Sequence, residues 1–398
     1  MQLERKQRPQ TMTQAQPERF YSLDALRGIA ALCVVFWHWQ HFFYTGTTAG
    51  QFDPGRLPFS DGLSLLYTKG WLAVDLFFCL SGFIFYWLYS KKIACRDITS
   101  GQFALLRFSR LYPLHFASLL IVAIGQLWLS HTRGNYFVYP CNDAKHFLLN
   151  LLFTSSWGLE QGYSFNAPIW SVSVEVLLYI VFFSCCRLLP VRAVILAAIS
   201  ITGFQLIQDY YLPIGRGIGS FFLGGLVFIA YQAVLKSKHA AALRQFVLLI
   251  TLCAWLLCMA ALHQKTDFNS LTIFNYPLAH RMLELIWSWP VVVLFPLSIL
   301  SLALIETRHG PFARRIAFLG DISYSSYLLH FPLQILFSIL LAYFSFDQAI
   351  YYSPWLMLLF FALLLMISFI SFRYFEMPAQ KRLRQINLLG QKTVQSTI

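Results

Sequence analysis

Long apolar segments alternate with short polar ones along almost the whole chain. Each apolar segment holds about 20 residues, the length that a helix needs to cross the hydrocarbon core of a bilayer. The pattern predicts ten membrane-spanning helices at residues 22–43, 71–90, 111–130, 168–189, 191–208, 216–235, 242–262, 285–306, 320–345 and 352–375. The expected fold class is therefore an all-α polytopic membrane protein with about ten transmembrane helices and both termini in the cytoplasm.

Polar ends flank this apolar region. Residues 1–20 are rich in Gln, Arg, Lys and Glu, and they predict a disordered cytoplasmic tail. Residues 21–380 form the expected membrane domain, and residues 381–398 form a short basic cytoplasmic tail. The first span is too long for a cleavable signal peptide and lacks a small-residue cleavage pattern, so we expect it to be retained as an anchor.

The distribution of charge explains the basic excess. The chain is 58% hydrophobic and 12% charged, with a formal net charge of +13. With the N-terminus inside, the inner segments hold 22 Lys and Arg, the outer loops hold 7, and Arg27 lies within the first span. This asymmetry follows the positive-inside rule, so no nucleic-acid partner is expected. Arg216 lies at the outer edge of the sixth span and is expected at the membrane interface.

The first span carries two ionisable residues on one face. Arg27 and His38 are eleven positions apart, which brings them to within about 20° of each other around a helix and about 16 Å apart along it. Arg27 alone could be the charge that orients the helix, and His38 alone could be a buried histidine bonded to a neighbouring backbone group. Together, and with Asp24 one turn before Arg27, they favour a functional site, because charges inside a membrane are rarely accidental.

The second and third spans add further candidates. Ser81 and Gly82 fall near the middle of the second span, where small residues can also serve close helix packing. Arg107 and Arg110 are three positions apart, hence neighbours on a helix face at the expected cytoplasmic mouth of the third span. Two arginines there could bind phosphate groups or could simply follow the positive-inside rule.

Polar stripes also mark the fourth and ninth spans. Ser171, Glu175 and Tyr179 are spaced by four, which predicts a single stripe with Glu175 about 10 Å below the outer face. Tyr327 and His330 share a face of the ninth span, and His330 is expected near the middle of the membrane. A histidine paired with a carboxylate suits general-base catalysis, which typically contributes about 10²–10⁴-fold.

At these motifs the chain resembles the acyltransferase-3 family of integral-membrane O-acyltransferases. The resemblance rests on six ordered blocks: LDALRGIAALCVVFWH, DLFFCLSGF, RFSRLYP, WSVSVE, GDISYSSYLLH and FRYFEMP. It implies ten core helices, a cytoplasmic acyl-coenzyme A donor, usually acetyl-coenzyme A, and a carbohydrate or glycolipid acceptor. It maps an arginine-then-ten-then-histidine pattern onto Arg27 and His38, with His38 as the catalytic histidine. Some members carry an extracellular hydrolase-like domain, so such a partner would here be a separate periplasmic protein.

The resemblance and the residue pattern together predict a mechanism in a bacterial inner membrane. Arg27, Arg107 and Arg110 hold the coenzyme A phosphates, and His38 acts as general base or acyl carrier. Glu175 orients His38 or balances its charge, and the expected stabilisers of the oxyanion are Ser81, Tyr327 and His330. No metal is expected, since the eight cysteines contain no CxxC pair. The alternatives are a small-anion transporter with a proton relay through the same residues and a non-catalytic membrane sensor.

Overall fold

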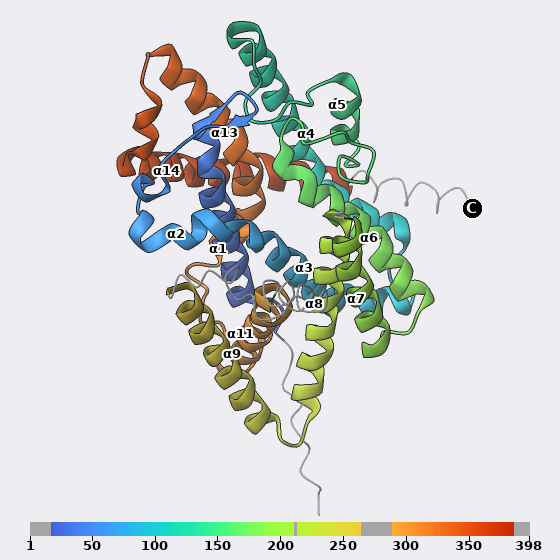
Figure 1. Ribbon diagram of the computed structural model, residues 1–398. Helices are drawn as coiled ribbons and strands as arrows, with labels where there is room; N and C mark the ends of the chain where they lie inside the picture. The colour runs from blue at the N-terminus through green and yellow to red at the C-terminus, as the bar shows by residue number, and fades with distance from the viewer. Residues whose placement is uncertain (1–16, 211–212, 264–288, 386–398) are drawn as a thin grey trace, which may run out of the picture.

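The structure is a computed structural model that describes residues 17–210, 213–263 and 289–385, and these residues are almost entirely helical (Figure 1). One short antiparallel pair joins β1 (Tyr44–Thr45) to β2 (Thr48–Ala49). The helices are α1 (Tyr21–His38), α2 (Ser60–Lys69), α3 (Ala73–Ala94), α4 (Ser100–Arg133), α5 (Ala144–Leu151), α6 (Trp170–Leu188), α7 (Ala193–Tyr210), α8 (Pro213–Lys236), α9 (Ala240–His263), α11 (Phe295–His309), α12 (Phe318–Asp321), α13 (Ser323–Tyr343) and α14 (Pro354–Ile370). Short 3₁₀ turns are η1 (Trp39–Phe43), η2 (Pro54–Arg56), η3 (Gly70–Leu72), η4 (Ala167–Ile169) and η7 (Gln348–Tyr352), and the π-helical segments are η6 (Pro290–Leu294) and η8 (Ser371–Glu376).

The expected all-α polytopic class is confirmed. Within the described residues, eight helical stretches are long and apolar enough to cross a membrane. The predicted span 191–208 matches a shorter apolar helix, and the predicted span 22–43 matches α1, whose 18 residues include Asp24, Arg27 and His38. Neither is among the eight, and residues 285–288 of the eighth predicted span lie outside the described residues. The total of ten spans and the cytoplasmic termini stay predictions.

The helix α4 begins well before the predicted third span. It starts at Ser100, and Thr99 caps it by accepting a hydrogen bond from the backbone N–H of Gln102, whose side chain bonds back to the Thr99 N–H. Such a capping box satisfies two N–H groups that a helix start otherwise leaves unpaired. Arg107 and Arg110 therefore lie two to three turns inside a continuous helix.

The helix α1 lies at the centre of the fold, where it contacts α2, α3, α11, α12 and α13 (Figure 1). Its contact with α12 is a backbone approach, because a Cβ at Gly28 would collide with Leu319 and one at Gly320 would collide with the Asp24 backbone. Only glycine at both positions allows the two backbones to come this close. This contact brings the start of α13 beside the Arg27 end of α1.

A carboxylate from α11 closes the first turn of α1. The Glu306 side chain is 3% exposed and accepts hydrogen bonds from the backbone N–H groups of Tyr21 and Ser22, both at 2.8 Å. It also accepts from the Ser22 hydroxyl at 2.5 Å. The first N–H groups of a helix have no partner within it, and a negative charge there is favoured by the helix dipole.

The helices α3 and α8 form the other close pair. A Cβ at Gly82 would meet the carbonyl oxygen of Phe221, and a Cβ at Gly224 would meet that of Cys79. Small residues allow this approach in the absence of a hydrophobic driving force between membrane helices. Asp75 and Arg216 join the same two helices in an ion pair at 2.6 Å. Arg216, whose place at the membrane interface stays a prediction, thus has a partner within the protein, and the Asp75 side chain is only 4% exposed.

Candidate active site

Six of the eight residues that have a role in the predicted mechanism line one cavity of about 190 Å³. They come from α1, α3, α4, α6 and α13, and they are Arg27, Ser81, Arg107, Arg110, Glu175 and Tyr327. The rest of the wall is formed by side chains of α3, α4, α6 and α13, and it includes Ser171 and Tyr179 of the predicted polar stripe. The structure therefore brings together, in one place, polar residues that the sequence places on five separate helices.

A second cavity of about 400 Å³ adjoins the first. The two share Arg27, Ile84, Leu88, Arg110 and Tyr324, so these side chains form the boundary between them. The second cavity is lined by the starts of α1 and α13, by the second half of α3 and by η8. In the predicted topology these segments meet at the cytoplasmic side of the membrane, so the second cavity is predicted to lie on the cytoplasmic side of the first.

Two of the three arginines have a buried N–H group without a partner. Arg27 donates to the Gly320 carbonyl oxygen at 2.8 Å and pairs with Asp24 at 2.9 Å. Arg107 donates to the Tyr89 hydroxyl at 2.7 Å, and its guanidinium carbon lies 5.0 Å from that ring's centre. In both side chains the Nε atom is buried without a hydrogen-bond partner among the described residues. Buried donors are costly unless paired, which makes these two suited to an anionic ligand.

Ser81 and Glu175 contact each other in the wall of the cavity. The Ser81 hydroxyl donates to a Glu175 carboxylate oxygen at 3.2 Å, while its neighbour Gly82 packs against α8. Gly82 thus serves close helix packing, whereas a functional role of Ser81 stays a prediction. Tyr327 donates its hydroxyl proton to the Pro168 carbonyl oxygen at 2.8 Å and contacts the Ser171 hydroxyl at 2.8 Å.

His38 lies beyond the Tyr327 end of the cavity, inside a cluster of imidazole rings. Its ring centre is 4.8 Å from that of His330 and 4.7 Å from that of His41. The His38 Nδ1 atom lies 3.0 Å from the Val34 carbonyl oxygen, and the His330 Nδ1 atom lies 2.6 Å from the Tyr327 carbonyl oxygen. A carbonyl can only accept, so both Nδ1 atoms carry a proton and both Nε2 atoms keep a lone pair in the neutral rings.

This hydrogen bonding bears on the roles expected for His330 and Glu175. The His330 Nε2 atom is buried and has no hydrogen-bond partner in the described part of the chain, and in the neutral ring it accepts hydrogen bonds rather than donating them to an oxyanion. The hydrogen bonds described above join Glu175 to Ser81 and His38 to Val34, not the two residues to each other. Within the described residues, no group of three or more His, Cys, Asp or Glu side chains could hold a metal ion.

Three features of the site were not singled out from the sequence. His41 follows His38 by three positions, a spacing that signals a shared face. Glu376 lines the second cavity and accepts hydrogen bonds from Ser325 and, at 3.0 Å, from Ser371. The third is the ion pair between Asp75 and Arg216, because the sequence does not show which residue each of them faces.

The fold and this site define a multi-helix membrane protein with an arginine-lined cavity and, beyond the Tyr327 end of that cavity, a buried histidine cluster. A family model described as "Acyltransferase domain" matches residues 20–373, so the chain belongs to the acyltransferase-3 family and to the acyltransferase class. This membership favours acyl transfer over the transporter and sensor alternatives. No solved structure matches the chain.

Three curated relatives match parts of the chain. "Protein 2 in picA locus" of Rhizobium radiobacter is 43% identical over 112 residues, which cover 28% of this chain and 48% of that protein. "Acyltransferase MdmB" of Streptomyces mycarofaciens is 32% identical over 182 residues, covering 44% and 42%. "Putative membrane-bound transacylase BcsY" of Komagataeibacter xylinus is 26% identical over 295 residues, covering 68% and 69%. The chain thus spans less than half the length of the first two relatives.

Proposed function

We propose that this protein is a membrane O-acyltransferase of the bacterial inner membrane. It moves an acyl group, in the first place acetyl, from cytoplasmic acyl-coenzyme A to a hydroxyl of a carbohydrate or glycolipid acceptor at the outer side, with or without a separate periplasmic partner. One observation carries this proposal: an arginine-lined cavity extends to Tyr327, whose ring centre lies 6.0 Å from that of His330, and His330 lies 4.8 Å from the buried ring of His38. Membership of the acyltransferase-3 family supports it.

The donor binds at the arginine end. Coenzyme A carries phosphate groups, and guanidinium groups bind phosphate through two parallel N–H bonds. The unpartnered Nε atoms of Arg27 and Arg107 supply such donors, and Arg110 lines both cavities beside them. The thioester of a donor held there extends through the first cavity toward the histidines.

The reaction takes place at His38. The C–S bond of the thioester breaks, a C–O bond to the acceptor forms, and the hydroxyl proton leaves finally on the coenzyme A thiol. The Nε2 atom of His38 is the base or the nucleophile, because it carries a lone pair whereas the Nδ1–H is bound to the Val34 carbonyl oxygen. Glu175, held by Ser81, balances the positive charge of the arginines and of a charged His38 through space.

Acyl transfer in membranes tests the proposal. Membranes with equal amounts of wild type or His38→Ala receive radiolabelled acetyl-coenzyme A, and label is then measured in thiol, lipid and polysaccharide fractions. We expect label in a glycan fraction with the wild type and a loss of at least 100-fold with His38→Ala. His115→Ala is the matched control, because His115 is fully buried but bonds to the Asn150 carbonyl oxygen outside the cluster.

Two outcomes contradict the proposal. Equal labelling by wild type and His38→Ala would remove His38 from the reaction. Absence of label in every fraction, with acetyl-coenzyme A and with longer acyl donors, together with anion flux that depends on His38, would establish the transporter alternative.

A further inference from the structure

The three histidines form a row from the cavity to the outer segments. His330 is nearest the cavity, because its ring centre lies 6.0 Å from that of Tyr327. His38 is in the middle, 4.8 Å from His330 and 4.7 Å from His41. His41 belongs to η1, where the α1 helix tightens into a 3₁₀ turn, and its ring is 5.5 Å from Tyr44 and 5.6 Å from Tyr139.

His41 is buried and incompletely bonded. Its side chain is among the buried polar groups of the protein, at 6% exposure, and its Nδ1 atom has no hydrogen-bond partner among the described residues. The Gln334 side chain interacts with His41, although its Oε1 atom makes no hydrogen bond of ordinary geometry among the described residues, and its Nε2 atom donates to the His38 carbonyl oxygen at 2.7 Å. Buried polar atoms are normally paired, so the His41 ring is suited to a partner that arrives with a ligand.

The bonding of His38 leaves it a single reactive atom. Its Nδ1–H is bound to the Val34 carbonyl oxygen, so only Nε2 has a lone pair. If Nε2 carries the acyl group, the His38 ring has no base left to remove the proton of an acceptor hydroxyl. A second base beside His38, on the side away from the donor cavity, meets that need.

We propose that His41 is this acceptor-side base. In the first step His38 Nε2 attacks the thioester carbonyl, the C–S bond breaks, and the coenzyme A thiolate leaves. In the second step the unprotonated ring nitrogen of His41 takes the proton of the acceptor hydroxyl while the oxygen attacks the acyl carbon, and the C–N bond to His38 breaks. The proton then passes from His41 to the thiolate or to water. This inference rests on the proposed function and assigns His38 the role of acyl carrier.

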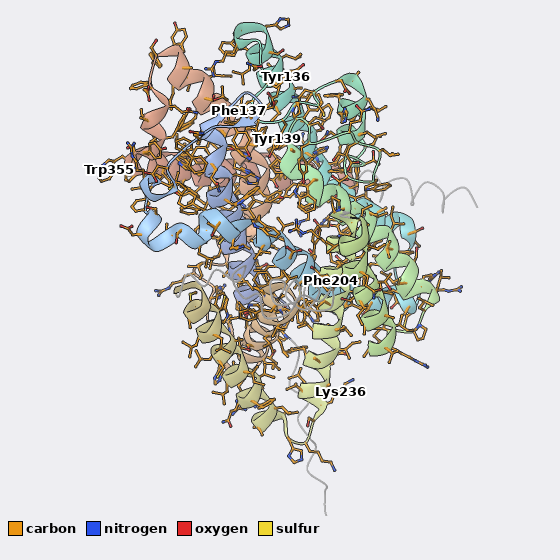
Figure 2. All side chains as sticks on the ribbon, viewed as in Figure 1. Tyr136, Phe137, Tyr139, Phe204, Lys236 and Trp355 are labelled. Atoms are coloured by element: carbon orange, nitrogen blue, oxygen red, sulfur yellow. The ribbon has the colours of Figure 1, made fainter. Side chains whose placement is uncertain are left out.

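The surroundings of His41 suit a sugar hydroxyl. Tyr139 contacts His41 and also Tyr163, which is 54% exposed and 6.0 Å from Tyr139 between ring centres. In the view of Figure 2, Tyr139 lies in the upper part of the molecule and Lys236 near its lower end, and Lys236 is predicted to face the cytoplasm. A row of aromatic rings, each with a polar hydroxyl, provides flat surfaces for the apolar face of a sugar on the way to His41.

Separating the two half-reactions tests this inference. Purified protein in lipid nanodiscs receives radiolabelled acetyl-coenzyme A without acceptor, and thiol release and label retained on protein are measured. Membranes that contain the acceptor report complete transfer. With His41→Asn and His41→Phe we expect labelled protein at wild-type levels but complete transfer reduced about 10²–10⁴-fold, the usual contribution of a general base. His38→Gln should abolish protein labelling and transfer together.

The two His41 variants separate catalysis from packing. Phenylalanine keeps an aromatic ring among Trp37, Tyr44, Tyr139 and Phe331, whereas asparagine does not, so a packing role would spare His41→Phe. His115→Gln serves as the control for losing a buried histidine elsewhere. Wild-type transfer by His41→Phe, or an equal loss of thiol release and transfer in both variants, would overturn the inference. Wild-type protein that transfers no label to any fraction would instead overturn the proposed function.

Discussion

Glu306 is expected to be the strongest single contact of α1 outside its apolar packing. The substitution Glu306→Ala removes the acceptor of the Tyr21 and Ser22 N–H groups and of the Ser22 hydroxyl. Each buried donor left unpaired costs about 1–3 kcal/mol, and the two N–H groups together give about 2–6 kcal/mol. Because Tyr21 is only half-buried and can reach water, we expect the free energy of unfolding to fall by about 3 kcal/mol.

The assay is reversible unfolding of the purified protein in mixed micelles with a rising fraction of denaturing detergent, followed by tryptophan fluorescence. Glu306→Gln keeps one acceptor oxygen, so its loss should be about half that of the alanine variant. Glu160→Ala is the matched control, because Glu160 accepts a local hydrogen bond from the Gly158 N–H in an exposed turn. A Glu306→Ala protein within about 1 kcal/mol of this control would refute the reasoning, because the cap would then add no more than a surface contact.

Three further perturbations test the packing and the donor site. Gly82→Ala drives a methyl group into the α8 backbone, so we expect most of the protein to leave the monodisperse fraction in gel filtration, whereas Gly101→Ala, with open space around it, should elute as wild type. Asp75→Asn leaves the Arg216 charge without its carboxylate, and the same unfolding assay should show a loss of about 3 kcal/mol, partly recovered when Arg216→Met is added; no recovery would contradict the pairing. Arg107→Lys loses the planar, stacked guanidinium, so the KM for acyl-coenzyme A should rise about tenfold with kcat within about threefold, and an unchanged KM would remove Arg107 from donor binding.

Helical periodicity made part of this site predictable. The spacing of Arg27 and His38 along one helix, and of Ser171 and Glu175 along another, fixes which residues share a face. It does not say which faces meet, so the Ser81–Glu175 contact, which joins residues 94 positions apart, had to come from the structure. The same holds for Arg216, which lies at a predicted membrane edge but finds its partner 141 positions away in Asp75.

His41 escaped notice for a local reason. The apolar periodicity of the first span suggests one uninterrupted helix over 22–43, but α1 ends at His38 and the chain continues as the 3₁₀ turn η1. Residues three positions apart are about 60° apart around an α-helix but eclipse each other in a 3₁₀ turn, so the turn brings His41 closer beside His38 than the helical spacing indicates. The aromatic residues around His41 gave no composition signal either, because aromatic residues make up 17% of the chain.

The helix α1 determines how far apart Arg27 and His38 lie, as well as placing them on one face. Arg27 and His38 stand on one unbroken helix, about 16 Å apart along its axis, and both ends of that helix are held, by Glu306 at its start and by Gln334 at the His38 carbonyl oxygen. For the proposed reaction α1 therefore fixes the distance between the donor-binding arginine and the reactive histidine. A donor anchored by its anionic group at Arg27 must reach that far to bring its thioester to His38. A short thioester that lacks the anchor should lose turnover as well as affinity, because its binding energy can no longer hold the carbonyl carbon in place.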